Sequence, residues 1–467
     1  MVRKAHLGTR RKPPRAGDIT LTARLVMKFA ADLCPIMDGA SLRLQRDGRE
    51  LVLPITSAGQ RVFWHSFCDG ADADARKQAL GQLPAADRFA LVASIETLRR
   101  GSWIVEELFL GDRLVLTRTV ISDWFEPTPV DPAQAYGMSR FALLRSDSCG
   151  LMLESPRCHA RLTVAAHSAG RCAALLATGV APGWDRDPET AAIVRMLAEC
   201  GLLVARFPDQ SSAEDQDANL REWEFHDLLF HARSRAGRHR DPYGKSNPAP
   251  QSELPTPEAL RPAPDRIVLA LPDARDVARR DPSFDSVLEG RRTVRTAPEH
   301  PLTLATLAEF LFRSARIQRS DDGSPAGAWR PFASAAGRNE LELYLSVHSC
   351  TGLTPGLFRY DAVDHALDPI AMSDQAGILL AKYCGPKPSG VHVIVTARFA
   401  RISQRYRSLA YSLVLRNAGC LLQTMYLVAT ALGRAPCAIG AGDADLFGRI
   451  AGLPYEVQGS VADFVLK

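Results

Sequence analysis

The sequence predicts an α+β protein in which two kinds of region follow one another along the chain. Short strand-like and helical stretches alternate in the first half, and a Pro-rich stretch at 241–264 then interrupts all regular pattern. After it come a short, apolar, β-branched run at 391–396 and an apolar stretch of helical length at 413–432. We expect these last two to form a buried central strand and a core helix.

The bulk composition is that of an ordinary folded protein. Of the 467 residues, 46% are hydrophobic and 23% are charged, and at the usual domain size this length gives about two to four domains. The ten cysteines include no CxxC pair, so the spacing of common zinc sites is absent and a reducing compartment is favoured. No apolar run reaches the roughly 18–20 uninterrupted residues of a membrane helix, and no signal peptide follows the charged start. We therefore expect a cytoplasmic protein with no metal and no membrane segment.

The excess of positive charge is confined to the start of the chain. Lys and Arg total 57 against 52 for Asp and Glu, and six of the basic residues lie before residue 16. The remainder is therefore close to neutral. Because no aromatic residue is interleaved with those charges, we interpret residues 1–16 as a solvated basic tail. A nucleic-acid-binding arm is the alternative, which we do not favour.

The first half of the chain is expected to hold small helices followed by β-hairpins. The expected hairpins and strands span residues 42–54, 102–116, 141–144 with 150–154, and 202–207. The expected helices span residues 85–101, 171–178 and 190–200. This order predicts two winged-helix-like units in tandem, residues 17–135 and 136–240, the second of which includes a connecting helix.

One apolar helical stripe lies near the end of the second unit. Phe225, Leu228, Leu229 and Ala232 recur at helical spacing, which predicts one buried face. The nearby histidines, at 226 and 231, are five residues apart and so do not stack on one helix face. We interpret them as bordering a packing surface rather than binding a metal.

Beyond residue 266 the pattern changes, and a basic cluster follows the first expected helix. The expected elements are helices at 284–289, 304–314 and 413–432 and strands at 341–347 and 391–396. Arg291, Arg292, Thr293 and Arg295 place three guanidiniums and a hydroxyl within five residues. Guanidiniums grip phosphate in a bidentate manner, which suits a nucleotide. A solvated basic turn is the plainer alternative.

Two further clusters flank the expected strands. Ser334 and Ala335 belong to a run of small residues before the strand at 341–347, whose alternating pattern is typical of a partly buried edge. Such a run lets backbone approach a flat ring, or forms an ordinary tight loop. Arg405 and Tyr406 follow the buried strand and combine a guanidinium with a phenol that can move protons or orient a substrate. A packed ring with an exposed hydroxyl is the alternative.

The order of these stretches resembles the SagB-type dehydrogenases, the thiazole- and oxazole-forming branch of the nitroreductase family. The Arg-Arg-Ser-x-Arg element of that family corresponds to residues 291–295, its aromatic-Arg-x-x-Arg stretch to 312–316, and its Arg-Pro-Tyr-Pro-Ser and Leu-Glu-Leu-Tyr segments to 330–345. Its Gly-Leu-x-x-Gly-Leu-aromatic-x-Tyr segment, Gly-His-Leu-Leu-Gln helix and Cys-Pro-x-Gly turn correspond to residues 352–360, 419–423 and 437–440. Residues 223–235 are also similar to the part that precedes the catalytic domain in longer members.

This resemblance implies a nitroreductase-like domain that binds FMN noncovalently at a homodimer interface. The cofactor-binding positions correspond here to Arg291, Arg292, Thr293, Arg295, Ser334, Ala335 and Gly440. The first four would lie near the phosphate and the ring edge, the next two would face the isoalloxazine, and the glycine would bring backbone to N5.

The resemblance also implies a catalytic pair with one change of residue type. The Lys-Tyr pair that supports substrate oxidation in this family corresponds to Arg405 and Tyr406. A guanidinium stays protonated, so Arg405 can stabilise negative charge but cannot act as a general base. Tyr406 is therefore the expected proton-transfer group. Further departures are Ala333 for the usual Pro, Asn417 for Glu and Cys420 for His.

The implied activity is FMN-dependent oxidation of thiazolines or oxazolines to azoles in a ribosomally synthesised peptide. The precursor peptide would be the substrate, and a cyclodehydratase is an expected partner. The alternatives are a flavin oxidoreductase acting on a nitroaromatic or quinone, and a catalytically impaired scaffold in a peptide-modifying complex. The expected domain plan is a tail at 1–16, units at 17–135 and 136–240, a Pro-rich linker at 241–265, and the FMN-binding domain at 266–467.

Overall fold

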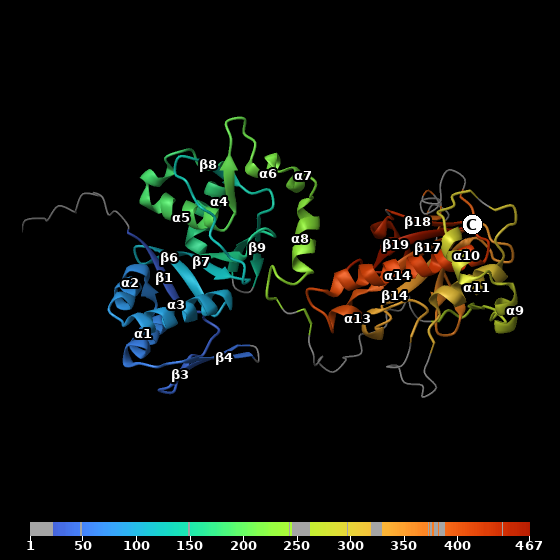
Figure 1. Cartoon of the computed structure of the whole chain (residues 1–467). Coiled ribbons are helices and arrows are strands. Elements are labelled where there is room, and N and C mark those ends of the chain that lie inside the picture. The colour runs from blue at the N-terminus through green and yellow to red at the C-terminus, as the bar shows by residue number, and fades with distance from the viewer. Residues whose placement is uncertain are drawn as a thin grey trace, which may run out of the picture. The chain divides into compact units, whose positions relative to one another are not determined.

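The chain divides into two compact units, Met1–Arg240 and Asp241–Lys467 (Figure 1). Each unit has its own apolar cores. The computed structural model describes residues 22–46, 49–147, 150–241, 243–244, 262–296, 298–318, 329–371, 373, 376–377, 382, 388–440 and 442–467. The predicted basic tail and most of the predicted linker lie outside these residues. Both units combine helices with sheets, so the predicted α+β class is confirmed.

The first half of the N-terminal unit contains three helices followed by a hairpin. Its strands are β1 (Ala23–Phe29), β2 (Ile36–Met37), β3 (Ser41–Arg46), β4 (Arg49–Pro54), β5 (Ala71–Asp72), β6 (Ile104–Leu110) and β7 (Arg113–Val120). Its helices are α1 (Ala58–Asp69), α2 (Ala73–Gly81) and α3 (Ala85–Arg100). The side chains of Ser57 and Asp72 accept hydrogen bonds from backbone N–H groups in the first turns of α1 and α2, which fixes where these helices begin. Both predicted hairpins and the predicted helix are confirmed.

The second half of the unit continues with strands β8 to β12 and helices α4 to α8. The strands are β8 (Ala135–Met138), β9 (Leu143–Asp147), β10 (Gly150–Glu154), β11 (Ala160–Val164) and β12 (Leu203–Arg206). The helices are α4 (Ala169–Thr178), α5 (Pro188–Glu199), α6 (Ala213–Gln216), α7 (Ala218–Arg221) and α8 (Phe225–Arg233). The strand predicted at 141–144 begins two residues later, because Phe141 is fully buried in a turn instead of extending the strand.

A single seven-stranded sheet runs through both halves, in the order β5-β1-β6-β7-β11-β10-β9. The antiparallel pairing of β7 with β11, from Val120 opposite Ala160 to Leu116 opposite Val164, joins the two halves. One apolar core surrounds Trp64 in the first half, and a second core surrounds Leu162 on the shared strands. The core around Leu162 takes residues from both predicted units, such as Leu116 of the first, and the sheet has no break between the units.

The apolar stripe predicted on α8 is confirmed. Phe225, Leu228 and Leu229 are half-buried and Ala232 is buried, whereas both histidines of this helix are exposed. The ring of His231 lies beside that of Trp223, with the ring centroids 5.5 Å apart.

The C-terminal unit contains every helix and strand that the sequence predicts for it. Its strands are β13 (Ile267–Val268), β14 (Leu341–Val347), β15 (Gly356–Asp361), β16 (Ala366–Ile370), β17 (Val391–Arg398), β18 (Pro436–Ile439) and β19 (Gln458–Leu466). Its helices include α9 (Ala274–Arg280), α10 (Phe284–Gly290), α11 (Leu304–Ala315), α13 (Phe399–Ser403), α14 (Ala410–Ala431) and α15 (Ala444–Ala451).

The sheet of this unit has the order β13-β16-β15-β14-β17-β19-β18, which corrects one expectation. Strand β17 is central and almost wholly buried, as predicted. Strand β14 is not an edge strand, because it pairs with β15 on one side and β17 on the other. The polar residues of β14 had suggested a solvent-exposed edge strand. Glu342 and Ser346 instead contact polar side chains on the face of the sheet opposite α14.

Helix α14 packs along the first face of this sheet together with α11 (Figure 1). Val414, Leu421 and Met425 are fully buried on it, whereas Arg416 and Gln423 are exposed. The predicted core helix is therefore confirmed. Within the described ranges, no helix is both long enough and apolar enough to span a bilayer.

We expect the shared sheet of the N-terminal unit to make Leu162 essential for its stability. Leu162 is fully buried on β11 and faces the core between β7 and β10. Leu162→Ala should lower the free energy of unfolding of this unit by about 2–5 kcal/mol, the usual loss for a buried leucine. Urea unfolding followed by tryptophan fluorescence measures the change. The control is Leu144→Ala on β9, a side chain 43% exposed, which should change stability by less than about 0.5 kcal/mol.

Candidate functional site

The basic cluster begins where α10 ends, and Tyr426 of α14 anchors it. The backbone N–H of Arg291 donates to Val287, which closes the last turn of the helix. The guanidinium of Arg291 then lies over the ring of Tyr426, 5.3 Å from its centroid. Thr293 Oγ1 is 2.9 Å from the hydroxyl oxygen of Tyr426. One aromatic side chain thus positions two of the four predicted residues.

The same hydroxyl connects the cluster to the strand that precedes Gly440. The backbone N–H of Ala438 donates to the Tyr426 hydroxyl oxygen at 2.8 Å, which leaves the hydroxyl proton available for Thr293. The backbone N–H of Val294 donates to Pro436 at the start of β18, at 2.9 Å. Arg291, Thr293 and the end of β18 therefore form one local structure.

The surroundings of this structure are positive and open. Gly440 is exposed, and a methyl group in place of its hydrogen would have no atom within 4 Å. Arg292 donates to the carbonyls of Glu289 and Arg291, and Lys467 donates to the carbonyl of Arg295. In the part of the chain that the structure describes, none of these arginines forms an ion pair with a carboxylate. Their charges are free to bind an anion.

Ser334 and Ala335 belong to a second structure, which is built around a buried carboxylate. Glu340 is fully buried. The side-chain amide of Asn417 donates to Glu340 at 2.6 Å, and its oxygen accepts the backbone N–H of Ala335 at 3.2 Å. Ser334 Oγ donates to the other oxygen of Glu340 at 3.4 Å. The loop of small residues is thereby held to α14, and Ala336 takes a left-handed φ of +51° within it.

The departure at Asn417 has a physical reason in this arrangement. A glutamate here, as the resemblance leads one to expect, would bring a second carboxylate to Glu340 in a buried setting. Two buried like charges repel strongly. The amide of Asn417 instead donates to the carboxylate and accepts from the loop.

Arg405 and Tyr406 lie in a third place, the turn between α13 and α14. The backbone N–H of Tyr406 donates to Ile402 at 2.9 Å, and the Arg405 guanidinium is 5.9 Å from the centroid of the Tyr406 ring. Gly244 forms a β-bridge with Tyr406. A Cβ at Gly244 would lie 2.7 Å from the carbonyl oxygen of Arg405, so this approach requires glycine.

The structure therefore brings some predicted residues together and keeps others apart. Arg291, Thr293 and Gly440 share one region, whereas Ser334 and Ala335 share another. Their anchors on α14, Tyr426 and Asn417, are nine residues apart, which corresponds to about 13 Å along the helix axis.

Two residues that matter here escaped the sequence analysis. Tyr426 lies in a long apolar stretch, where a tyrosine is ordinarily a packed ring. Glu340 lies two residues before another glutamate, Glu342. Glu340 could not be singled out because no spacing rule distinguishes a buried carboxylate from an exposed one. A helical wheel of α14 would have placed Asn417 toward the sheet, since the neighbouring Val414 and Leu421 are buried.

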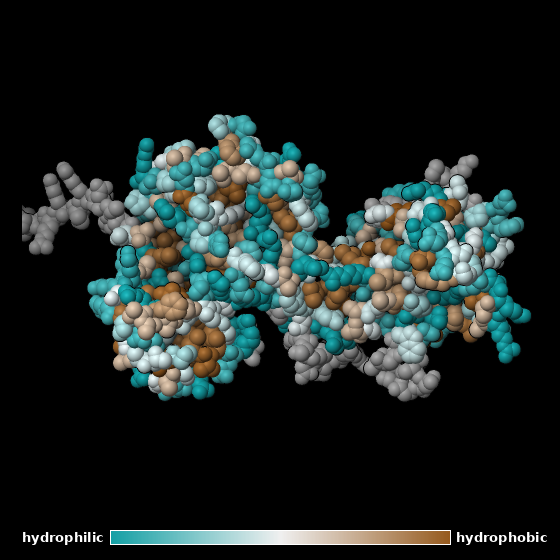
Figure 2. Space-filling model, in the orientation of Figure 1, coloured by the Kyte–Doolittle hydropathy of each residue, from teal (hydrophilic) through white to brown (hydrophobic). Residues whose placement is uncertain are grey.

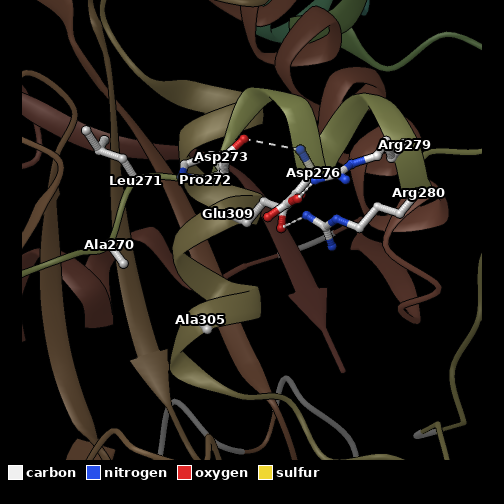
Figure 3. Close-up of a pocket in the computed structure, with 9 residues that line it drawn as sticks. All are labelled: Ala270, Leu271, Pro272, Asp273, Asp276, Arg279, Arg280, Ala305 and Glu309. Atoms are coloured by element: carbon white, nitrogen blue, oxygen red, sulfur yellow. Dashed lines mark hydrogen bonds and ion pairs between the residues drawn. The ribbon is translucent and has the colours of Figure 1, made fainter.

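One cavity of about 490 Å³ lies elsewhere in this unit, between α9, α11 and the segment 270–272 (Figure 3). Asp276 pairs with Arg279 and Arg280 pairs with Glu309, while Asp273 accepts hydrogen bonds from backbone N–H groups at the start of α9. No predicted site residue lines it. The described residues also contain no group of three or more His, Cys, Asp or Glu side chains arranged to hold a metal.

Two family models match the chain. The nitroreductase family model matches residues 288–462, and the model of the cyanobactin oxidase ThcOx matches residues 136–240. A Methanocaldococcus jannaschii protein named as a nitroreductase is 26% identical to this chain over 181 residues. The match covers 38% of this chain and 85% of that protein.

Solved structures are also similar to this chain. A structure titled as a nitroreductase of Ralstonia eutropha has 20% identity and a TM-score of 0.35, covering 48% of this chain and 96% of its own. A chain of the E. coli microcin synthetase McbBCD complex, solved with truncated pro-MccB17, has 17% identity and a TM-score of 0.32. The match covers 43% of this chain and 83% of that one. On the family matches, residues 288–462 form a nitroreductase-family domain, which follows a segment of the cyanobactin oxidase ThcOx family at residues 136–240.

Proposed function

We propose that this chain is an FMN-dependent oxidoreductase that oxidises thiazolines or oxazolines to azoles in a ribosomally synthesised peptide. The observation that carries the proposal is the presence, in one chain, of a nitroreductase-family domain and a segment of a peptide-modifying oxidase family. The order of motifs from residue 291 to residue 440 supports the same substrate class.

The residues at the first site fit the chemistry of FMN. A flavin mononucleotide presents a dianionic phosphate and a flat ring. Arg291, Arg292 and Arg295 offer guanidiniums without carboxylate partners among the described residues, which suits the phosphate. The open space at Gly440 lets a ring approach backbone closely. When bound there, FMN would supply the acceptor for a hydride.

The third site supplies the groups that the proton transfer needs. Conversion of an azoline to an azole removes one proton and one hydride from the ring. Tyr406 is proposed to take the proton, because Arg405 stays protonated and cannot. To take the proton Tyr406 would act as its phenolate, and the guanidinium of Arg405, which lies near the Tyr406 ring, would stabilise that phenolate before the transfer.

The homodimer belongs to the proposal because the order of motifs resembles a family in which FMN lies at a homodimer interface. Tyr411, Leu415 and Gly419 recur every four residues and are exposed on α14, which provides an apolar contact face. Analytical ultracentrifugation of FMN-loaded protein tests this, and a monomer with full FMN occupancy would contradict it.

The N-terminal unit is proposed to hold the leader of the precursor peptide. Phe89 and Val92 are exposed on α3, and Val62 is exposed on α1. Figure 2 shows apolar side chains gathered over the part of this unit that carries these helices. Exposed apolar patches of this kind mark interaction sites.

We expect the purified protein to release FMN on heating and to bind added FMN. Arg291→Gln removes a charged donor from the phosphate and should weaken FMN binding about 10- to 100-fold. Quenching of flavin fluorescence measures the affinity. Arg279→Gln, an exposed arginine of α9 that pairs with Asp276, is the control and should bind FMN normally. If neither released nor added flavin is detected, the proposal fails.

We expect the enzyme to remove two hydrogens from each azoline ring of a cyclised precursor peptide, which mass spectrometry detects. Tyr406→Phe should lower the rate about 10²- to 10⁴-fold without loss of FMN. Full activity of that variant would exclude Tyr406 as the proton-transfer group. If Arg405→Lys raised a near-zero rate, the native chain would be the impaired scaffold. Oxidation of NAD(P)H with nitroaromatics or quinones, and none of azolines, would instead favour the general flavin oxidoreductase.

We expect Phe89→Ser to raise KM for a leader-bearing peptide about 5- to 50-fold, because a side chain 79% exposed in the free protein would lose its buried contact in the complex. Steady-state kinetics with leader-bearing and leaderless peptides measures this effect. The leaderless peptide and the Leu144→Ser control should be unaffected. Equal KM values for native and Phe89→Ser protein would remove α3 from the docking surface.

A further inference from the structure

A second cavity of the C-terminal unit, of about 300 Å³, has a lining dominated by charge. The residues that line it are Pro262, Ile317, Arg330, Glu342, Leu343, Arg359, Tyr360, Asp361, Ala362, Val363, Asp364, Arg398 and Arg401. None of them belongs to the proposed FMN or proton-transfer residues. Four guanidiniums in a cavity of this size call for an anionic occupant or complete internal pairing.

Strand register places three of the charged side chains on one face of the sheet. Glu342 is two residues from Tyr344, and Arg359 is directly opposite Tyr344 on β15. Arg398 is two residues from Thr396, the cross-strand partner of Glu342. Glu342, Arg359 and Arg398 therefore project from the face opposite α14. A guanidinium nitrogen of Arg359 lies 3.9 Å from one carboxylate oxygen of Glu342, and a guanidinium nitrogen of Arg398 lies 3.7 Å from the other.

The aspartates around the cavity pair with Arg266 and with Arg359. Arg266 pairs with Asp361 at 2.8 Å and with Asp364 at 3.0 Å. Asp368 forms ion pairs with Arg266 at 2.9 Å and with Arg359 at 2.6 Å. These three carboxylates form ion pairs with Arg266 and Arg359, and none of those pairs includes one of the deeper arginines.

Those deeper arginines, Arg330 and Arg401, are held by neutral groups. Arg330 donates to the backbone carbonyls of Ala315 and Leu341, at 3.1 and 2.9 Å. Arg401 donates to the carbonyl of Asn339 at 2.8 Å. Across the described ranges, neither guanidinium has a carboxylate within ion-pair distance. Burial lowers the pKa of Arg330 to about 10, and burial together with the Arg398 charge lowers the pKa of Arg401.

Two buried polar atoms at the cavity lack hydrogen-bond partners among the described residues. They are Nε of Arg359, a donor, and Oε2 of Glu342, an acceptor. Buried polar atoms are ordinarily satisfied, so such a pair indicates a missing partner. An occupant that accepts from the guanidinium and donates to the carboxylate would satisfy both.

We propose that this cavity binds a small oxyanion that also carries an O–H group. Its charged oxygens would accept from Arg359, Arg398 and Arg401, and its O–H would donate to Glu342. Monobasic phosphate and 2-hydroxycarboxylates have this combination of groups, whereas acetate has the charge without the donor. The site is independent of the proposed flavin chemistry, because it shares no residue with it.

Titration calorimetry of the purified full-length protein tests the proposal, with sodium phosphate, glycolate and acetate at ionic strength matched with chloride. Phosphate and glycolate should bind more tightly than acetate. Arg401→Gln should weaken binding of both about 10- to 100-fold. Arg279→Gln, in α9 outside this cavity, should bind as the native protein does. Arg291→Gln should also leave glycolate binding unchanged, which separates this site from the phosphate end of the proposed FMN site.

Glu342→Gln provides a second test that does not depend on the stability of the Arg401 variant. It removes the negative charge while retaining an acceptor, so acetate should bind more tightly and the preference for glycolate over acetate should shrink. Absence of heat with phosphate and glycolate in folded native protein would overturn the proposal. Equal glycolate affinity in native and Arg401→Gln protein, or loss of binding in Arg291→Gln alone, would overturn it as well.

Discussion

The burial of one face of α14 against the sheet is the constraint on which the C-terminal unit depends. Val414, Leu421 and Met425 fill the interface with β14, β17 and β19. Burying three such side chains contributes several kcal/mol, and it fixes the rotation of the helix about its axis. That rotation directs Asn417 to the loop 334–335 and Tyr426 to the basic cluster. The two polar anchors are therefore positioned by their apolar neighbours.

The positions of the helices and strands could be predicted from the sequence, but the polar contacts between them could not. Strands such as β17 and helices such as α11 follow from periodicity and capping residues, which are local properties. Strand β14 was misplaced at an edge because Glu342 and Ser346 look like solvent-facing residues. Their partners come from β15, β17 and the chain beyond β14, and sequence spacing does not reveal contacts between distant segments.

The candidate site shows the same division. Arg291, Thr293 and Gly440 could be chosen from motif order, and the structure places the first two beside the end of β18. The role of Tyr426 could not be predicted, because its hydroxyl contacts Thr293 and Ala438, which come close to α14 only in the folded chain. The arginines also separate into two kinds that composition cannot distinguish. Arg292 is exposed on a turn, whereas Arg330 is buried and held by backbone carbonyls.

The continuous sheet of the N-terminal unit limits how this chain can be divided or recombined. The segment that matches the ThcOx family begins at residue 136, yet its strand β11 pairs with β7, which lies upstream of that boundary. In a chimera that exchanged residues 136–240 alone, β7 would have to pair with a foreign strand in place of β11, and a mismatch there would leave both strands with open edges. Unpaired strand edges invite aggregation. The segment that behaves as one exchangeable module therefore begins with β1, and sequence similarity alone would place the crossover in the wrong position.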